Sequence, residues 1–317
     1  MELFFDLIFV AAIAQIGIPL QVDFTYTGLF RYSFLFVLIW SAWSGHSLYC
    51  SRFESDDLVQ RALTVVQCFL AAVMAANAKE SLDSRSAAGF GAAYAGIRLV
   101  LAIQYARLTH DGSTRPFALR SGIGIFLAAL LWVASALVPI PTRYVLWGVA
   151  LTADLTVPWI TRRHGSRFPP DAGHFRERVS LFTIILVGEY MASVMRGIES
   201  QETWSPPAAL AAVSGTIGGF VIFWCYFDFA RADGHSHTRT IAERHKFLLW
   251  YSVHLPLGIS VATVGIGMQR VIGPYPLTGQ SIKILTAALT TVAISLFILR
   301  SAIQVHDAGQ AQPRGTG

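Results

Sequence analysis

The feature that most constrains this chain is a succession of ten apolar segments, nearly all close to 20 residues long. A helix needs roughly 17 to 25 apolar residues to cross about 30 Å of hydrocarbon, so each segment is long enough to span a bilayer or nearly so. The segments are residues 3–22, 29–50, 61–77, 89–108, 119–138, 143–159, 179–195, 208–229, 247–268 and 282–301. Their apolar runs are continuous rather than alternating, which is typical of helices and not of barrel strands. The sequence therefore predicts an all-α, polytopic transmembrane helical bundle of ten spans.

Composition supports a membrane protein, because 54% hydrophobic and 14% charged residues leave too few charges to cover a soluble globule. The connections are short, which favours a single transmembrane domain over residues 1–303. The polar end of the chain, residues 304–317, is rich in Gly and Gln and is predicted to be a flexible tail. The longest predicted cytoplasmic connection, residues 161–178, is where the bundle would divide into unequal parts.

The distribution of Lys and Arg predicts how the bundle is oriented. Most of these residues lie in the connections after the second, fourth, sixth and eighth segments and in the tail. Because Lys and Arg concentrate in cytoplasmic loops, both termini are expected in the cytoplasm. The first segment starts at residue 3 without a basic region before it, which favours a retained span over a cleaved signal. The net charge of +5 fits this loop bias and an anionic lipid surface as partner, with no need for nucleic acid.

Ionisable residues inside the apolar segments point to function. A charged side chain at the centre of a bilayer costs roughly 2.5 to 3.5 kcal/mol, so it usually faces a partner, a cavity or a pathway. Arg98 cannot lose its charge and needs an acid or a carbonyl at that depth, for which Asp154 and Glu189 are the candidates. A purely structural arginine–carboxylate clamp is the alternative. The candidate residues of a substrate or ion pathway are Glu2, Asp6, His46, Arg98, Asp154, Glu189 and His254.

A count of charges sharpens this expectation. Asp6, Asp154 and Glu189 carry three negative charges, whereas Arg98 is the one base predicted near the centre of a span. Two acids would then be protonated, solvated in a cavity, or matched by a mobile cation. The count favours a proton or cation pathway over an anion site.

Several of these residues also have a simpler interpretation. Glu2 and Asp6 lie on one helix face near the expected cytoplasmic end, where the helix dipole favours acids. His46 is interpreted as a packing residue rather than as part of a proton path, and His254 gains weight from Pro256, which frees a main-chain carbonyl. The glycines at 215 and 219 are expected to pack within the fold.

Other classes of site find little support in the sequence. Asp233, His235 and His237 stand in a polar loop without a closed set of ligands, so no metal site is predicted. The three cysteines are interpreted as apolar packing residues, and no cofactor is expected. The chain contains no GxxxxGK[ST], GxSxG or HExxH pattern, which leaves nucleotide hydrolysis and the familiar hydrolases unsupported.

Three stretches of the chain resemble the bacterial low temperature requirement protein A family. They are ELFFDLIFVAAIAQ from Glu2, ERVSLFTIILVGE ending at Glu189, and YSVHLPL around His254. The resemblance implies a multi-pass protein of the bacterial inner membrane, singles out Glu2, Asp6, Glu189 and His254, and supplies no substrate. In the family pattern a cytoplasmic stretch usually precedes the first motif.

Three functions remain open at this point. The first is a permease or channel-like protein in which Asp6, Asp154, Glu189 and His254 line a cavity around Arg98 and protonation of Glu189 gates a small solute or cation. The second is a membrane-embedded enzyme that uses Glu189 or Asp154 as the acid on an isoprenoid or other lipid-soluble substrate, with aromatics such as Trp43, Tyr94 and Trp250 around a carbocation. The third is a scaffold with a polar core. A homo-oligomer is compatible with each.

Overall fold

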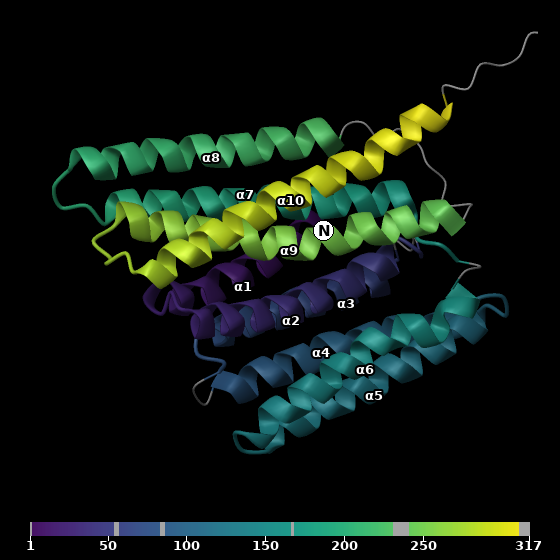
Figure 1. The fold of residues 1–317 in the computed structure, drawn as a ribbon. Helices are drawn as coiled ribbons and strands as arrows, with labels where there is room; N and C mark the ends of the chain where they lie inside the picture. Colours follow the sequence, from purple (N-terminus) through teal and green to yellow (C-terminus); the bar gives the residue numbers. More distant parts are fainter. Residues whose placement is uncertain (1, 54–56, 83–85, 166–167, 231–240, 311–317) are drawn as a thin grey trace, which may run out of the picture. The chain divides into compact units, whose positions relative to one another are not determined.

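A computed structural model describes residues 2–53, 57–82, 86–165, 168–230 and 241–310, and the regular structure in these residues is helical. The helices are α1 (Glu2–Val22), α2 (Tyr26–Cys50), α3 (Leu58–Ala78), α4 (Ser86–Arg107), the short 3₁₀ turn η1 (Leu108–His110), α5 (Arg115–Leu137), α6 (Thr142–Gly165), α7 (Ala172–Glu199), α8 (Pro206–Ala230), α9 (Ile241–Ile272) and α10 (Gly279–Gln310). Each of the ten apolar segments coincides with one of α1 to α10 (Figure 1). The all-α prediction is therefore confirmed for the described residues.

Eight helices in the described part of the chain are long and apolar enough to cross a membrane, namely α1, α3, α4, α5, α7, α8, α9 and α10. The other two, α2 and α6, have the length but lack a stretch that is apolar enough. Helix α2 carries Arg31 and a Ser-Gly-His-Ser stretch, and α6 carries Asp154 and, close to its end, two arginines. The count of ten spans and the cytoplasmic termini therefore stay predictions.

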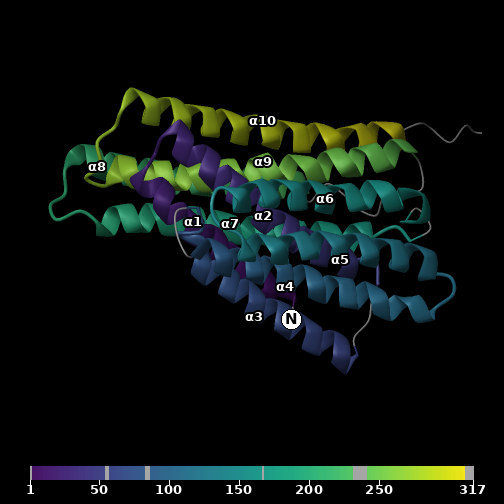
Figure 2. The same ribbon diagram turned by 90° about the horizontal axis from the view of Figure 1, so that it is seen from below.

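The chain divides into two compact units. Unit 1 comprises Met1–Pro19 and Arg31–Arg178, and unit 2 comprises Leu20–Phe30 and Val179–Gly317. In unit 1, α3 packs on α4, α4 on α5, and α5 on α6 (Figures 1 and 2). In unit 2, α8, α9 and α10 pack on one another. The boundary at residue 178 coincides with the end of the 161–178 connection, and the prediction of a single domain stays a prediction.

Local sequence signals explain where several helices begin and end. Asp57 caps α3, since its carboxylate accepts a hydrogen bond of 2.8 Å from the main-chain N–H of Gln60. A proline occupies the first turn of α5, where its missing N–H costs nothing. At the other end of α5, Arg143 donates to the carbonyls of Ser135 and Val138 at 2.9 and 2.8 Å. Helix α10 continues to Gln310, past residue 304 at which the sequence predicts the tail to begin.

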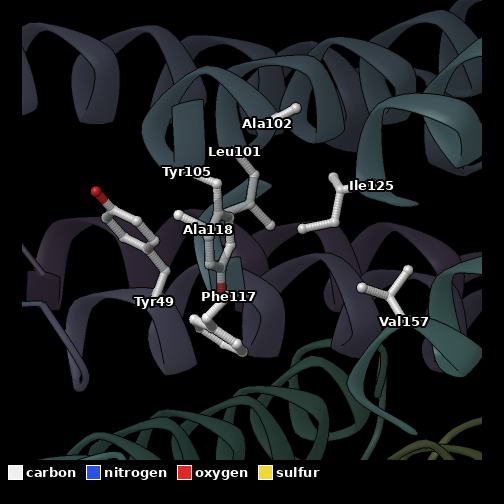
Figure 3. Close-up of a cluster of buried hydrophobic side chains, with 8 residues drawn as sticks. All are labelled: Tyr49, Leu101, Ala102, Tyr105, Phe117, Ala118, Ile125 and Val157. Carbon is white, nitrogen blue, oxygen red and sulfur yellow. The ribbon is translucent and has the colours of Figure 1, made fainter. Parts of the chain in front are cut away.

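The apolar core of unit 1 is rich in aromatic side chains at the ends of α2 and α4 and the start of α5. Tyr105 makes edge-to-face contacts with Tyr49 and Phe117, with ring centroids 5.1 and 6.0 Å apart (Figure 3). The whole cluster consists of Tyr49, Leu101, Ala102, Tyr105, Phe117, Ala118, Ile125 and Val157. These contacts hold α2, α4, α5 and α6 together.

Glycines set the close approaches inside unit 2. A Cβ on Gly219 would lie 2.7 Å from the ring of Tyr190, and one on Gly215 would lie 3.2 Å from Val194 and from Met268. The GxxxG pattern of α8 therefore packs against α7 and α9, which confirms that it serves packing within the fold.

Candidate functional site

One of the buried polar groups in unit 1 is an ion pair between Arg98 of α4 and Asp154 of α6. The Arg98 Nε lies 3.0 Å from Asp154 Oδ2, and the two side chains are 6% and 2% exposed. The same Oδ2 accepts hydrogen bonds of 3.3 Å from the hydroxyl of Tyr94 and from the indole N–H of Trp132. Of the two candidate partners for Arg98, the structure places Asp154 against it.

Neighbouring helices fix the guanidinium of Arg98. Its Nη2 donates to the hydroxyl of Tyr94 at 3.0 Å and to the main-chain carbonyl of Ser41 at 3.2 Å. A Cβ on Gly45 would lie 2.4 Å from Arg98 Nη1, so the absence of a side chain there lets the guanidinium lie against α2. Trp132 stacks obliquely on Tyr94, with ring centroids 4.1 Å apart. Arg98 is therefore held in one position by groups from α2, α4 and α6.

A second buried ion pair joins Asp6 of α1 to Arg178 at the start of α7, also within unit 1. Arg178 Nη2 and the indole N–H of Trp43 both donate to Asp6 Oδ1, each at 2.6 Å. Both members of the ion pair are 1% exposed. An aspartate held by an arginine and a tryptophan thus occurs twice in unit 1.

The two aspartates share an asymmetry. In each, one carboxylate oxygen accepts all the donors, whereas the other oxygen, Oδ2 of Asp6 and Oδ1 of Asp154, is buried and has no hydrogen-bond partner within the described residues. Among the buried side-chain atoms that lack a hydrogen-bond partner within the described residues, these two oxygens belong to ion-paired carboxylates, which makes the two positions functional candidates.

Glu2 and His46 lie close to the Asp6 pair. Glu2 is 3.9 Å from Arg178 and 3.0 Å from the imidazole of His174. His46 packs its ring on Phe5, with centroids 4.3 Å apart, and its Nε2 lies 3.3 Å from the sulfur of Cys50. The structure thus brings Glu2, Asp6 and His46 together at one end of unit 1.

The charge count made from the sequence is wrong. It left two of three acids without a base, but Asp6 pairs with Arg178, Asp154 with Arg98, and Glu189 with Arg196 at 2.6 Å. The error arises because Arg178 and Arg196 lie just outside the predicted apolar segment 179–195, so the count did not include them. With the three acids matched by three arginines, the argument for a mobile cation no longer holds.

Glu189 and His254 belong to unit 2. Glu189 is 18% exposed, and its partner Arg196 is 43% exposed and also bonds Ser193, so this ion pair lies nearer the surface than the other two. His254 is buried, and its Nδ1 lies 2.6 Å from the main-chain carbonyl of Trp250. With that nitrogen as the donor, Nε2 accepts a hydrogen bond of 3.0 Å from the hydroxyl of Tyr226.

The predicted cavity that joins Asp6, Asp154, Glu189 and His254 around Arg98 involves both units and stays a prediction. In the described residues no three His, Cys, Asp or Glu side chains gather as a metal site would require. Asp233, His235 and His237 lie outside the described residues.

Residues 1–314 match the family described as "Bacterial low temperature requirement A protein (LtrA)". The chain belongs to the bacterial low temperature requirement A family. A curated relative, described as "Uncharacterized protein RA0937" of Rhizobium meliloti (strain 1021), is 27% identical over 280 residues, which cover 83% of this chain and 67% of the relative. No solved structure matches. Family membership and the apolar helices together make the chain a multi-pass membrane protein.

Sequence reasoning missed Arg178 as a buried partner, as well as Trp132 and Tyr226. In this member of the low temperature requirement A family, Arg178 is the second residue of the ERVSLFTIILVGE stretch, so it stands inside a motif that had been noticed for its acids. That position was the available signal for Arg178. Trp132 and Tyr226 stand in apolar runs, where nothing in the sequence separates a hydrogen-bonding aromatic from a packing one.

Proposed function

We propose that this protein is a permease in which protonation of Asp6 and Asp154 loosens the ion pairs with Arg178 and Arg98 and lets a small solute pass. The observation that carries the proposal is that each aspartate keeps one buried oxygen without a hydrogen-bond partner among the described residues. A proton can bind there without first breaking a hydrogen bond. The neutral acid then holds its arginine less strongly, so protonation shifts the balance between two packings of the helices.

The position of the two ion pairs supports this function. Each joins helices that are far apart in the sequence, α4 with α6 and α1 with α7, so loosening either pair frees whole helices to move. A buried ion pair is a costly way to stabilise a bundle, since apolar residues of similar size often do as well. Glu189, His46 and His254 stay predicted pathway residues in this proposal, whereas Asp6 and Asp154 take the role of the proton switch.

Reconstitution tests the permease. Metabolite profiling of cells with and without the gene identifies candidate solutes, and liposomes loaded with a pH dye then report proton entry when such a solute and an acid pulse are added outside. We expect the wild-type protein to accelerate acidification and both Asp6→Asn and Asp154→Asn to abolish the acceleration. Asp57→Asn is the matched control, because Asp57 forms an exposed pair with Arg107 and asparagine caps a helix as well as aspartate does. Equal rates in wild-type and protein-free liposomes would overturn the proposal.

A membrane-embedded enzyme is the second candidate, and one observation favours it. The three aromatics expected around a carbocation each contact an ionisable residue: Trp43 bonds Asp6, Tyr94 bonds Asp154, and Trp250 lies against His254 with ring centroids 4.3 Å apart. An aspartate ion-paired to arginine is a poor proton donor, which ranks this function second. A new product in the lipid extract of an expressing host, lost in Asp154→Asn, would establish it.

A further inference from the structure

Three donors converge on a single point between α4, α5 and α6. They are Arg98 Nε at 3.0 Å and the Tyr94 hydroxyl and Trp132 indole N–H at 3.3 Å, and the point is Asp154 Oδ2. A guanidinium and two neutral donors aimed at one oxygen form a cradle for a negatively charged oxygen. In this structure the oxygen belongs to the protein's own Asp154.

We infer that this cradle is the binding site of a small, singly charged oxyanion such as a short carboxylate, which replaces the Asp154 carboxylate once Asp154 has taken up a proton. The inference rests on the proposed function and deepens it by naming the class of solute. It departs from the cation favoured by the charge count, because that count is contradicted by the three ion pairs.

Electrostatics couples the proton to the anion. Arg98 stays charged at every relevant pH and is buried, so a neutral Asp154 would leave an uncompensated cation among apolar side chains. An entering anion restores the balance. One proton moves to the carboxylate of Asp154 and one anion moves to the guanidinium of Arg98, so the net charge of the site does not change. Transport through this site would therefore be electroneutral.

The surroundings of the cradle favour one negative charge and no more. Among the described residues, the charged or titratable groups that face Asp154 are Arg98 and Tyr94, both from α4. Helix α5 contributes the indole of Trp132, and α2 contributes the Ser41 carbonyl on the far side of the guanidinium. A single arginine balances a single charge, so a divalent anion would be left partly uncompensated.

The Asp6 pair is less suited to an anion. Arg178 there faces a second carboxylate, Glu2, at 3.9 Å, which would repel an entering anion. Asp6 also has two donors on its bonded oxygen, compared with three at Asp154. The two pairs therefore differ in role: both bind a proton under the proposed function, and the Arg98 site alone binds the solute.

Formate is the probe for the test, because it is small, singly charged and ionised near neutral pH. Saturation-transfer NMR of the formate proton on detergent-solubilised full-length protein gives its affinity at about pH 5.5 and about pH 7.5, on either side of neutrality. We expect wild-type protein to bind formate roughly tenfold more tightly at the lower pH. Neutral formamide should not compete, whereas acetate should.

Variants separate the groups of the cradle. Asp154→Asn mimics the protonated acid and should bind formate equally well at both pH values. Arg98→Gln should lose binding. In the Asp154→Asn background, Trp132→Phe should weaken binding several-fold, and this double variant keeps the test decisive if Arg98→Gln fails to fold. Asp57→Asn and Arg107→Gln are the controls, because they alter an exposed aspartate–arginine pair that shares α4, and both should behave as wild type.

The inference and the proposed function fail in different ways. Formate binding that persists in Arg98→Gln, or that stays pH-dependent in Asp154→Asn, would overturn the anion site even if liposome flux still requires Asp154. Proton uptake on formate addition, followed with a pH dye, should be one per formate in wild-type protein and absent in Asp154→Asn. Formate binding with proton uptake, together with liposome flux that does not require Asp154, would instead contradict the permease and leave the binding site standing.

Discussion

The buried arginine side chains among the described residues are neutralised in two ways. Arg98 and Arg178 bond an aspartate, whereas Arg143 and Arg270 bond main-chain carbonyls at the ends of helices. Arg143 bonds carbonyls at the end of α5, and Arg270 bonds the carbonyl of Gln21 at the end of α1, between the rings of Phe24 and Tyr275. The carbonyl end of a helix carries a partial negative charge that suits a cation. The buried arginine–aspartate pairs therefore differ from the arginines that bond helix ends, and they need an explanation of their own.

The energetic cost of the Arg98 pair can be measured with a double substitution. Asp154→Leu alone should lower the free energy of unfolding by roughly 3 to 5 kcal/mol, because it leaves Arg98 buried without a counter-charge. Arg98→Met with Asp154→Leu should recover most of that loss, since no charge remains to be neutralised. Unfolding titrations in mixed detergent micelles give both values, and simple additivity of the two single substitutions would contradict the pairing.

A second prediction at this scale concerns Asp57, which stands just before α3. The Gln60 main-chain N–H and then the Arg107 guanidinium hold the pKa of Asp57 below its ordinary value of 3.8. Because folding lowers this pKa, ionised Asp57 stabilises the folded state at any pH above its ordinary pKa. This stabilisation is lost as the pH falls through the lowered pKa of the folded state. A carbon-13 NMR titration of the Asp57 carboxyl group measures the pKa in the folded state. Arg107→Gln should move the pKa part of the way back, and an unchanged pKa would refute the ion pair.

At the scale of helices, glycines decide which helices approach each other most closely, because they have no side chain. A Cβ on Gly265 of α9 would lie 2.9 Å from the Cα of Tyr190 on α7, so a side chain there would force two backbones apart. Helix α9 also runs unbroken from Ile241 to Ile272 through Pro256. Packing between α7 and α9 is thus set by the absence of a side chain.

Substitution by alanine tests this close approach with an internal control. Gly265→Ala should lower the melting temperature, because the obstacle is main chain that cannot rotate away. Gly148→Ala on α6, which has nothing within 4 Å of the added Cβ, should be neutral or stabilise by up to about 1 kcal/mol, since alanine favours helix over glycine. Equal effects of the two substitutions would show that α7 and α9 do not pack as described.

For the whole molecule, the main open quantity is the number of spans. Ten spans or eight with a cytoplasmic start return the C-terminus to the cytoplasm, whereas loss of only one of α2 and α6 as a span would place it outside. We expect green fluorescent protein fused to the C-terminus to be fluorescent and alkaline phosphatase fused there to be inactive in a bacterial host. The opposite pattern would show that either α2 or α6 does not span the membrane.

The sequence alone determined the helices of this protein. The apolar length that a bilayer demands is a local property of the chain, so segment positions, the all-α class and the family resemblance could be read directly, and the ten predicted segments fall on ten helices. The sequence also pointed to Asp6, Arg98 and Asp154, because charges in apolar runs are conspicuous.

Only the tertiary structure decided which charges meet. Asp6 and Arg178 lie 172 positions apart, and Arg98 and Asp154 lie 56 apart, so each pair depends on how distant helices pack. Reasoning along single segments leaves Arg178 outside the apolar segment 179–195 and therefore leaves Asp6 unmatched. The physical reason is that burial and pairing belong to contacts between helices, whereas hydrophobic length belongs to each helix by itself.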